Sequence, residues 1–180
     1  MAKPLYGMAM DTRKCVGCSA CVIACKTENA LPSGAFRDWI RTETRGKFPT
    51  LHMEIRSERC NHCASPPCTG VCPTGSSHVS VGGTVQVNRS KCSGCKACIA
   101  ACPYGARYVH PRGYVDKCTF CMHRVQKGKL PACVEQCPTT SLTFGDLNDP
   151  ESELSKLLRS RKHKVRQPET GARPRHYYLL

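Results

Sequence analysis

The sequence predicts an α+β fold whose strands and helices are short and whose cohesion depends on cysteine. The 180 residues include 16 cysteines, about 9% of the chain. Leu, Ile, Val and Phe together make up only about 17%, which is too little for an ordinary apolar core. The cysteines are therefore expected to supply the cohesion that apolar side chains lack.

The expected regular elements follow from local patterns. Apolar or β-branched runs that end in turn residues predict strands at 3–11, 82–90 and 141–146. Short helices are expected from the third cysteine of two tight runs, at 21–29 and 98–106. No run approaches the roughly 18 apolar residues that a membrane-spanning helix needs.

Two segments contain none of the cysteines. Residues 31–56 form an insertion that holds the only tryptophan, Trp39. Residues 150–180 end in the apolar YYLL and carry basic side chains at Lys156, Arg159, Arg161, Lys162, Lys164, Arg166, Arg173 and Arg175. We expect this segment to be an extended arm that embraces a partner subunit, with a free solvated tail as the alternative.

The cysteines fall into four groups whose spacing repeats. Group one is Cys15, Cys18, Cys21 and Cys25; group two is Cys60, Cys63, Cys68 and Cys72. Group three is Cys92, Cys95, Cys98 and Cys102; group four is Cys118, Cys121, Cys133 and Cys137. Groups one and three match closely, and groups two and four share a proline before the third cysteine. The order indicates a tandem duplication of a two-group unit.

Three uses of the cysteines compete: disulfides, zinc and iron–sulfur clusters. A secreted disulfide scaffold is disfavoured because MAKPLYGMAM lacks the apolar region of a signal peptide. Zinc ribbons pair two CxxC knuckles and need no third cysteine three residues later. The run C-x2-C-x2-C-x3-C-P is typical of two-cluster iron–sulfur proteins, in which the fourth cysteine ligates the other cluster. Cys25 is therefore expected to ligate a different cluster from the one that the other three cysteines of group one hold.

Group one departs from this run in one respect. Groups two, three and four end in Cys-Pro, whereas Cys25 is followed by Lys26. A cation beside a ligand would raise a cluster's reduction potential, and a solvent-facing lysine would not. The formal charge of +14 would fall to about +6 if four clusters of about −2 each were bound. The charge therefore does not predict binding to nucleic acid.

The chain resembles the four-cluster ferredoxin-like subunits of complex iron–sulfur molybdoenzymes, in the dimethyl sulfoxide reductase family of assemblies. The resemblance covers roughly residues 6–147 and is carried by CNHCASPPCTGVCPTGSS, CPYGARYVHP and KCTFCMHRVQKGKLPACVEQCPT. These segments are most similar to the electron-transfer subunit of polysulfide reductase. The resemblance implies two ferredoxin-like modules, one from residues 1–30 and 103–149 and one from 57–102, with the insertion 31–56 and the arm 150–180.

The resemblance also implies four [4Fe–4S] clusters and their ligands. The first would be held by Cys15, Cys18, Cys21 and Cys137, and the second by Cys118, Cys121, Cys133 and Cys25. The third would be held by Cys60, Cys63, Cys68 and Cys102, and the fourth by Cys92, Cys95, Cys98 and Cys72. The first cluster would lie nearest the catalytic partner and the fourth nearest the membrane anchor.

The implied function is electron transfer without catalysis. The sequence has no Ser/His/Asp arrangement, no phosphate-binding glycine loop and no flavin or nicotinamide motif. The expected partners are a molybdopterin (Mo or W) catalytic subunit and an integral membrane quinone-binding anchor, acting on polysulfide, thiosulfate or a similar oxidant. The alternatives are a polyferredoxin-type partner of a hydrogenase or formate dehydrogenase and a zinc-stabilised interaction module. We expect membrane association through a partner, on the outer face if co-exported with the catalytic subunit and otherwise on the cytoplasmic face.

Several side chains near the cysteines have plain structural interpretations. With all ligand positions filled by cysteine, the histidines are expected to be packing or surface residues: His62, His110 and His123. Four aromatic residues lie near ligands in sequence and could shield clusters from water or simply pack: Tyr104, Tyr108, Tyr114 and Phe120.

Overall fold

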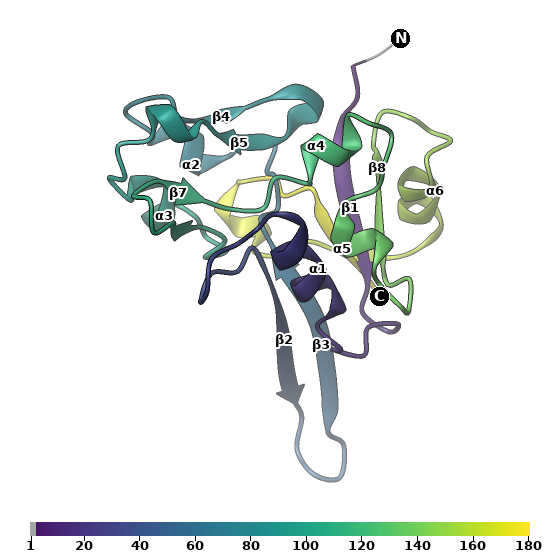
Figure 1. The fold of residues 1–180 in the computed structure, drawn as a ribbon. Helices are drawn as coiled ribbons and strands as arrows, with labels where there is room; N and C mark the ends of the chain where they lie inside the picture. Colours follow the sequence, from purple (N-terminus) through teal and green to yellow (C-terminus); the bar gives the residue numbers. More distant parts are fainter. Residues whose placement is uncertain (1–2) are drawn as a thin grey trace.

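The computed structural model describes residues 3–180, so the first two residues of the predicted first module lie outside it. One half of the molecule is built on a four-stranded sheet of order β8-β1-β10-β9 (Figure 1). Its strands are β1 (Tyr6–Asp11), β8 (Leu142–Asp146), β9 (His163–Lys164) and β10 (His176–Leu179). The strands expected at 3–11 and 141–146 are therefore confirmed.

The side chains of β1 alternate between two faces, as the period of a strand requires. Met8 and Met10 pack among the buried cysteines, whereas Ala9 faces the leucines of α6 (Glu153–Ser160). Ser152 caps α6 by accepting a hydrogen bond from the Ser155 N–H at 3.1 Å. Gly145 in β8 permits this close packing, because a Cβ there would lie 2.8 Å from Leu154.

Short helices follow the cysteine loops. In the first half these are α1 (Ala20–Glu28), α4 (Met122–Val125) and α5 (Ala132–Glu135). The helix expected at 21–29 is confirmed and begins one residue earlier, at Ala20. The helix expected at 98–106 is a single turn, α3 (Ala97–Ala100), which ends well before residue 106. A left-handed residue turns the loop into each helix, Ser19 at φ 62° and Lys96 at φ 65°.

The other half surrounds α2 (Pro67–Gly70) and α3 with short elements. These are β4 (Ser77–Val79), η1 (Val81–Gly83), β5 (Val85–Val87), η2 (Arg89–Lys91), β6 (Tyr108–Val109) and β7 (Val115–Asp116). The strand expected at 82–90 shrinks to β5 because 3-10 turns replace both of its ends.

The β6–β7 hairpin packs against the group-three loop. Gly94 lies at φ +71° and so close to this hairpin that a Cβ would be 2.5 Å from the Gly113 carbonyl oxygen. The Val115 N–H donates to Cys92 Sγ at 3.4 Å. In space, residues 108–116 therefore lie with group three, whereas the predicted module boundary at residue 103 assigns them to the other half.

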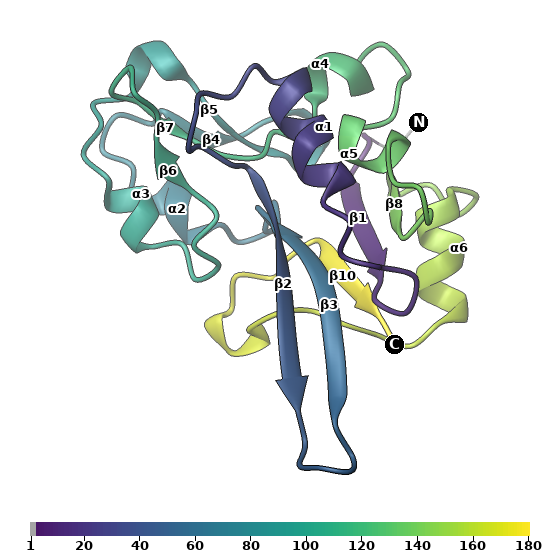
Figure 2. The same ribbon diagram turned by 60° about the horizontal axis from the view of Figure 1, so that its bottom comes forward.

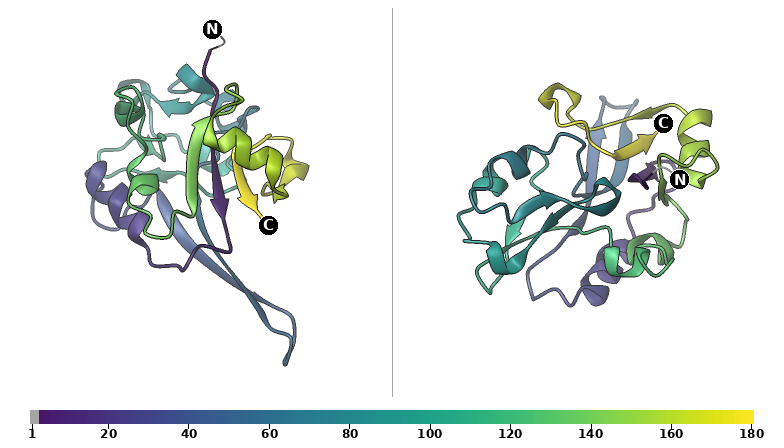
Figure 3. Two further views of the ribbon diagram at one scale, coloured as in Figure 1. Left: turned by 90° about the vertical axis from the view of Figure 1, so that its right-hand side faces the viewer. Right: turned by 90° about the horizontal axis from the view of Figure 1, so that it is seen from above.

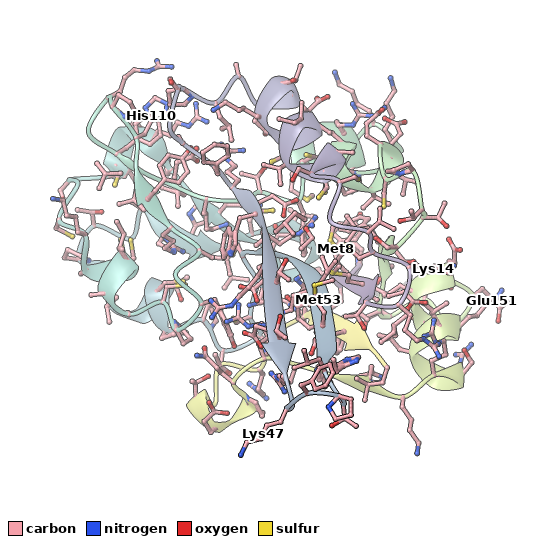
Figure 4. The ribbon with its side chains drawn as sticks, turned by 90° about the horizontal axis from the view of Figure 1, so that it is seen from below. Met8, Lys14, Lys47, Met53, His110 and Glu151 are labelled. Carbon is pink, nitrogen blue, oxygen red and sulfur yellow. The ribbon has the colours of Figure 1, made fainter. Side chains whose placement is uncertain are left out.

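The insertion is a long hairpin of β2 (Asp38–Arg45) and β3 (His52–Arg59) that projects from the body (Figure 2). Phe48 at its tip is 88% exposed. The opposite end is buried, including Asp38, Ser57 and Arg59. Figure 4 shows Lys47 at the outer end of the hairpin and Met8 near the middle of the molecule. The hairpin root therefore belongs to the cysteine-lined interior.

The structure corrects the expectation of an extended C-terminal arm (Figure 3). β10 pairs in parallel with β1, so the apolar end of the chain completes the sheet. His176, Tyr178 and Leu179 are each at most 1% exposed. The basic side chains are occupied within the chain: Arg166 binds Glu58 at 2.6 Å and Lys164 binds Glu54 at 3.2 Å. The segment folds back because its apolar residues fill the sheet and its cations meet acidic residues of β3.

Cysteine makes up much of the buried core, as composition predicted. The largest cluster joins Met8, Met10 and Phe120 to buried cysteines of groups one, two and four. A smaller cluster contains Cys68, Cys98, Val85 and Val115. Within residues 3–180, no helix is both long enough and apolar enough to cross a membrane.

Candidate iron–sulfur centres

Two cavities are each lined by four cysteines from different groups. The first cavity is lined by Cys25, Cys118, Cys121 and Cys133. The second is lined by Cys72, Cys92, Cys95 and Cys98. In each, three cysteines of one group meet a fourth from another. These combinations are those predicted for the second and fourth clusters.

The other two predicted sets are brought close enough for their charges to interact. Burial raises the pKa of Cys15 and of Cys21, and the neighbouring Cys137 raises both further. Burial raises the pKa of Cys63, and the neighbouring Cys60, Cys68 and Cys102 add to this effect, so that the pKa is about 12. The assignment of individual sulfurs to iron stays a prediction.

Matched hydrogen bonds hold the fourth cysteines of groups two and four. The Ser77 N–H donates to Cys72 Sγ and the Ser141 N–H to Cys137 Sγ, both at 3.3 Å. A threonine hydroxyl two residues after each cysteine lies 3.7 Å from its sulfur. Burial raises the pKa of both thiols and these hydrogen bonds lower it, with a lowered pKa as the net result. Both sulfurs are therefore set up to act as thiolates.

Two buried arginines donate directly to sulfur. Arg59 Nη1 lies 2.8 Å from Cys133 Sγ, and Arg107 Nη2 lies 2.9 Å from Cys68 Sγ. Arg59 also pairs with Asp38 at 2.9 Å. Hydrogen bonds to cluster sulfurs are one means by which a protein sets a cluster's potential.

The donor set fits an anionic iron–sulfur group. Burial raises the pKa of the Cys118 thiol to about 12, so its thiolate needs a bound metal to form. Lys117, Arg107 and Arg175 are buried, and none forms an ion pair within residues 3–180. A buried cation without an anion is costly, and clusters ligated by four thiolates would provide negative charge beside all three. Across the same residues, no three His, Cys, Asp or Glu side chains converge closely enough for one metal ion.

The cation after Cys25 is half-buried and is held by backbone carbonyl oxygens. Lys26 Nζ donates to the carbonyl oxygens of Pro32 at 2.7 Å and Ala35 at 3.1 Å. It also lies 4.7 Å from the centre of the Phe36 ring. Lys26 therefore closes the loop that leads to β2, a role that neither sequence interpretation anticipated.

The histidines pack or lie at the surface, as expected. His62 is fully buried, stacks on Phe120 with ring centroids 3.7 Å apart, and accepts the Val85 N–H at 3.1 Å. His110 stacks on Tyr114, and Figure 4 shows it at the edge of the molecule. His123 is exposed and pairs with Glu28 at 2.8 Å.

The aromatic residues divide between the two expected roles. Phe120 lines the cavity of Cys25 and group four. Tyr104 is buried, and burial together with Cys63 raises its pKa to about 12. Tyr108 donates to Asp116 at 2.7 Å, and Tyr114 packs under Arg89. The first two therefore lie against cysteines, and the last two serve the hairpin.

Sequence reasoning missed the buried charges around the cysteines. Arg59 and Lys117 each precede the first cysteine of their group, but the exposed Lys14 and Lys91 hold the same position in groups one and three, so this position alone does not indicate burial. Asp38 and Arg107 carry no local marker either, because their burial depends on hairpin pairing.

Comparison with known proteins agrees with this geometry. A family model described as a 4Fe-4S dicluster domain matches residues 51–147, and a second with the same description matches 14–76. Protein NrfC of Escherichia coli K12 is 47% identical over 96% of this chain and 79% of that protein. A polysulfide reductase chain of Wolinella succinogenes is 44% identical over 97% and 93%. A tetrathionate reductase subunit of Salmonella typhimurium is 39% identical over 97% and 72%.

These matches span nearly the whole chain. They confirm the resemblance found in the cysteine motifs. The chain therefore belongs to the 4Fe-4S dicluster family of iron–sulfur electron-transfer subunits of molybdoenzyme reductase complexes.

Proposed function

We propose that the chain carries electrons through four [4Fe–4S] clusters between a membrane quinone-binding subunit and a molybdopterin catalytic subunit. The ligand sets are those stated above, with Cys25 and Cys137 exchanged between groups one and four, and Cys72 and Cys102 between groups two and three. When bound, each cluster would take up and release one electron. The chain itself would perform no catalysis.

The observation that carries this proposal is the lining of the two cavities. Cys25 from α1 meets three cysteines of group four, and Cys72 after α2 meets three of group three. This exchange is what the C-x2-C-x2-C-x3-C-P run requires. A zinc module or a disulfide scaffold has no need for it.

The ends of the path are supported by exposure. Cys18 and Cys95 are the exposed cysteines, and they occupy equivalent second positions in groups one and three. The first and fourth clusters would therefore lie nearest the surface, where partners can exchange electrons with them. The second and third would be enclosed, since Cys118, Cys121, Cys60 and Cys63 are buried.

The terminal oxidant is proposed from the relatives. Polysulfide and tetrathionate appear in the names of two of them, which favours polysulfide, thiosulfate or a similar small sulfur compound. The same relatives favour this subunit role over a polyferredoxin partner of a hydrogenase or formate dehydrogenase. Association with the membrane would come through the anchor subunit.

Elemental analysis of protein purified anaerobically from its native host tests the proposal. We expect about 16 iron per chain, together with co-purifying molybdenum or tungsten. Full iron without either metal would favour the polyferredoxin alternative. Zinc in place of iron would contradict the cluster assignment.

A further inference from the structure

The tandem duplication extends to the hairpins that precede groups two and four. In the first hairpin, Trp39 pairs with Glu58, and Asp38 with Arg59 at the root. In the second, Tyr108 pairs with Asp116, so an aromatic residue again faces an acid. One position further in, Arg107 and Lys117 occupy the root positions equivalent to Asp38 and Arg59.

The root of the first hairpin lies beside the cysteines assigned to the first and second clusters. Ser57 Oγ lies 3.4 Å from Cys21 Sγ, and it donates a hydrogen bond to Asp38 Oδ1 at 2.7 Å. Arg59 reaches the opposite way, to Cys133 Sγ at 2.8 Å. This root therefore stands between the two sets of sulfurs.

The root of the second hairpin lies beside the cysteines assigned to the third and fourth clusters. Arg107 Nη2 donates to Cys68 Sγ at 2.9 Å, and Arg107 also lines the cavity of Cys72 and group three. Lys117 Nζ donates to the carbonyl oxygens of Val85 and Cys118. Its side chain is 1% exposed, and that of Arg107 is 5% exposed.

The two roots differ in net charge. Asp38 and Arg59 form an ion pair at 2.9 Å and cancel. Arg107 and Lys117 are both basic, and the described part of the chain provides neither with a carboxylate partner. Among residues 3–180, the Nε and Nη1 atoms of Arg107 find no hydrogen-bond partner. An arginine keeps its charge at any ordinary pH, so Arg107 remains a fixed cation.

A fixed cation in a low-dielectric interior stabilises an electron added nearby, and a carboxylate opposes it. We propose that the opposite charges of Asp38 and Arg107, at equivalent places in the duplicated hairpins, set a step in reduction potential along the chain of clusters. Arg107 raises the potentials of the third and fourth clusters, whereas Asp38 neutralises Arg59 and so withholds the same increase from the first and second. This inference rests on the ligand sets proposed above.

Redox titration of the anaerobically purified complex, followed by electron paramagnetic resonance, tests the step. Cys18→Ser and Cys95→Ser first assign the signals of the first and fourth clusters. Arg107→Gln is expected to lower the reduction potentials of the third and fourth clusters by at least about 59 mV, which is a tenfold change in the equilibrium constant for one electron. Asp38→Asn is expected to shift the first two clusters in the opposite direction. Arg112→Gln, an exposed arginine at the turn of the same hairpin, is the matched control and should change neither pair.

Two variants keep the test decisive if Arg107→Gln fails to assemble. Arg107→Lys retains the charge and should retain the potentials, and Asp38→Asn tests the other hairpin root independently. Unchanged potentials in a fully loaded Arg107→Gln or Asp38→Asn protein would overturn the proposal. Fewer than four cluster signals in the unsubstituted protein would instead contradict the proposed ligand sets.

Discussion

Cys25 of group one and Cys121 of group four lie against the same side-chain amide. Asn29 Nδ2 is 3.7 Å from Cys25 Sγ and 3.9 Å from Cys121 Sγ. Asn29 ends α1, and its amide also donates to the Cys25 carbonyl oxygen at 2.9 Å. The end of α1 therefore presents Cys25 to group four and away from the rest of its own group.

Replacing Cys25 with serine should damage the group-four centre. Cys25→Ser removes one of the four sulfurs that line that cavity, while Cys15, Cys18 and Cys21 keep their places. We expect paramagnetic resonance to show a lost or converted second cluster and an intact first cluster. The reciprocal variant Cys137→Ser should affect the first cluster instead. Loss of the first cluster in Cys25→Ser would contradict the exchange of fourth cysteines.

Breaking the Arg37–Asp116 ion pair should strongly destabilise the protein. The guanidinium binds both carboxylate oxygens at 2.8–3.0 Å, and both side chains are buried. Arg37→Met leaves a buried carboxylate unpaired, at a cost of about 3–5 kcal/mol. Thermal loss of cluster absorbance under anaerobic conditions should shift to lower temperature.

Two controls separate this pair from surface charge. The double variant Arg37→Met with Asp116→Leu should recover part of the loss, because no unpaired charge remains. Arg41→Met, on the exposed part of the same hairpin, should behave like the unsubstituted protein. An Arg37→Met protein as stable as Arg41→Met would show that the pair contributes little.

Removing residues 176–180 should prevent folding of the first half. This deletion takes away β10, the parallel partner of β1, and with it the buried side chains of Tyr178 and Leu179. Burial of the Leu179 side chain alone contributes roughly 1.5–3 kcal/mol. We expect little soluble, iron-loaded protein, measured as iron per chain and circular dichroism.

The control for this truncation is Leu180→Ser, because Leu180 is 51% exposed. That variant should load iron normally. A truncated chain that folds and loads iron but no longer binds its partners would instead restore the hypothesis of a partner-binding arm.

Removal of iron should unfold much of the chain. Cysteines provide a large part of both cores around the cavities, and a site absent from the unfolded state couples metal binding to folding. Anaerobic chelation should therefore collapse the circular dichroism signal together with cluster absorbance. Retention of native dichroism after complete loss of iron would show that the apolar residues suffice.

Local patterns determined the parts of this protein that depend on neighbours in sequence. The strands β1 and β8 were predictable because their apolar runs end in turns, and the helices α1 and α3 because each begins at a tight cysteine loop. The four cysteine groups and their duplication could be counted directly. Family membership followed from spacing, since cluster ligation constrains spacing more tightly than ordinary packing does.

Tertiary structure decided the features that depend on residues far apart. Nothing in YYLL distinguishes an arm from the strand that completes a sheet beside residues 6–11, because parallel pairing leaves no local signal. Likewise, Asp38 and Arg107 resemble ordinary surface charges in the sequence. Only the pairing of the two hairpins places these side chains in the interior, beside cysteine sulfurs. Composition and spacing therefore determined what the chain binds, and long-range packing decided which charges surround it.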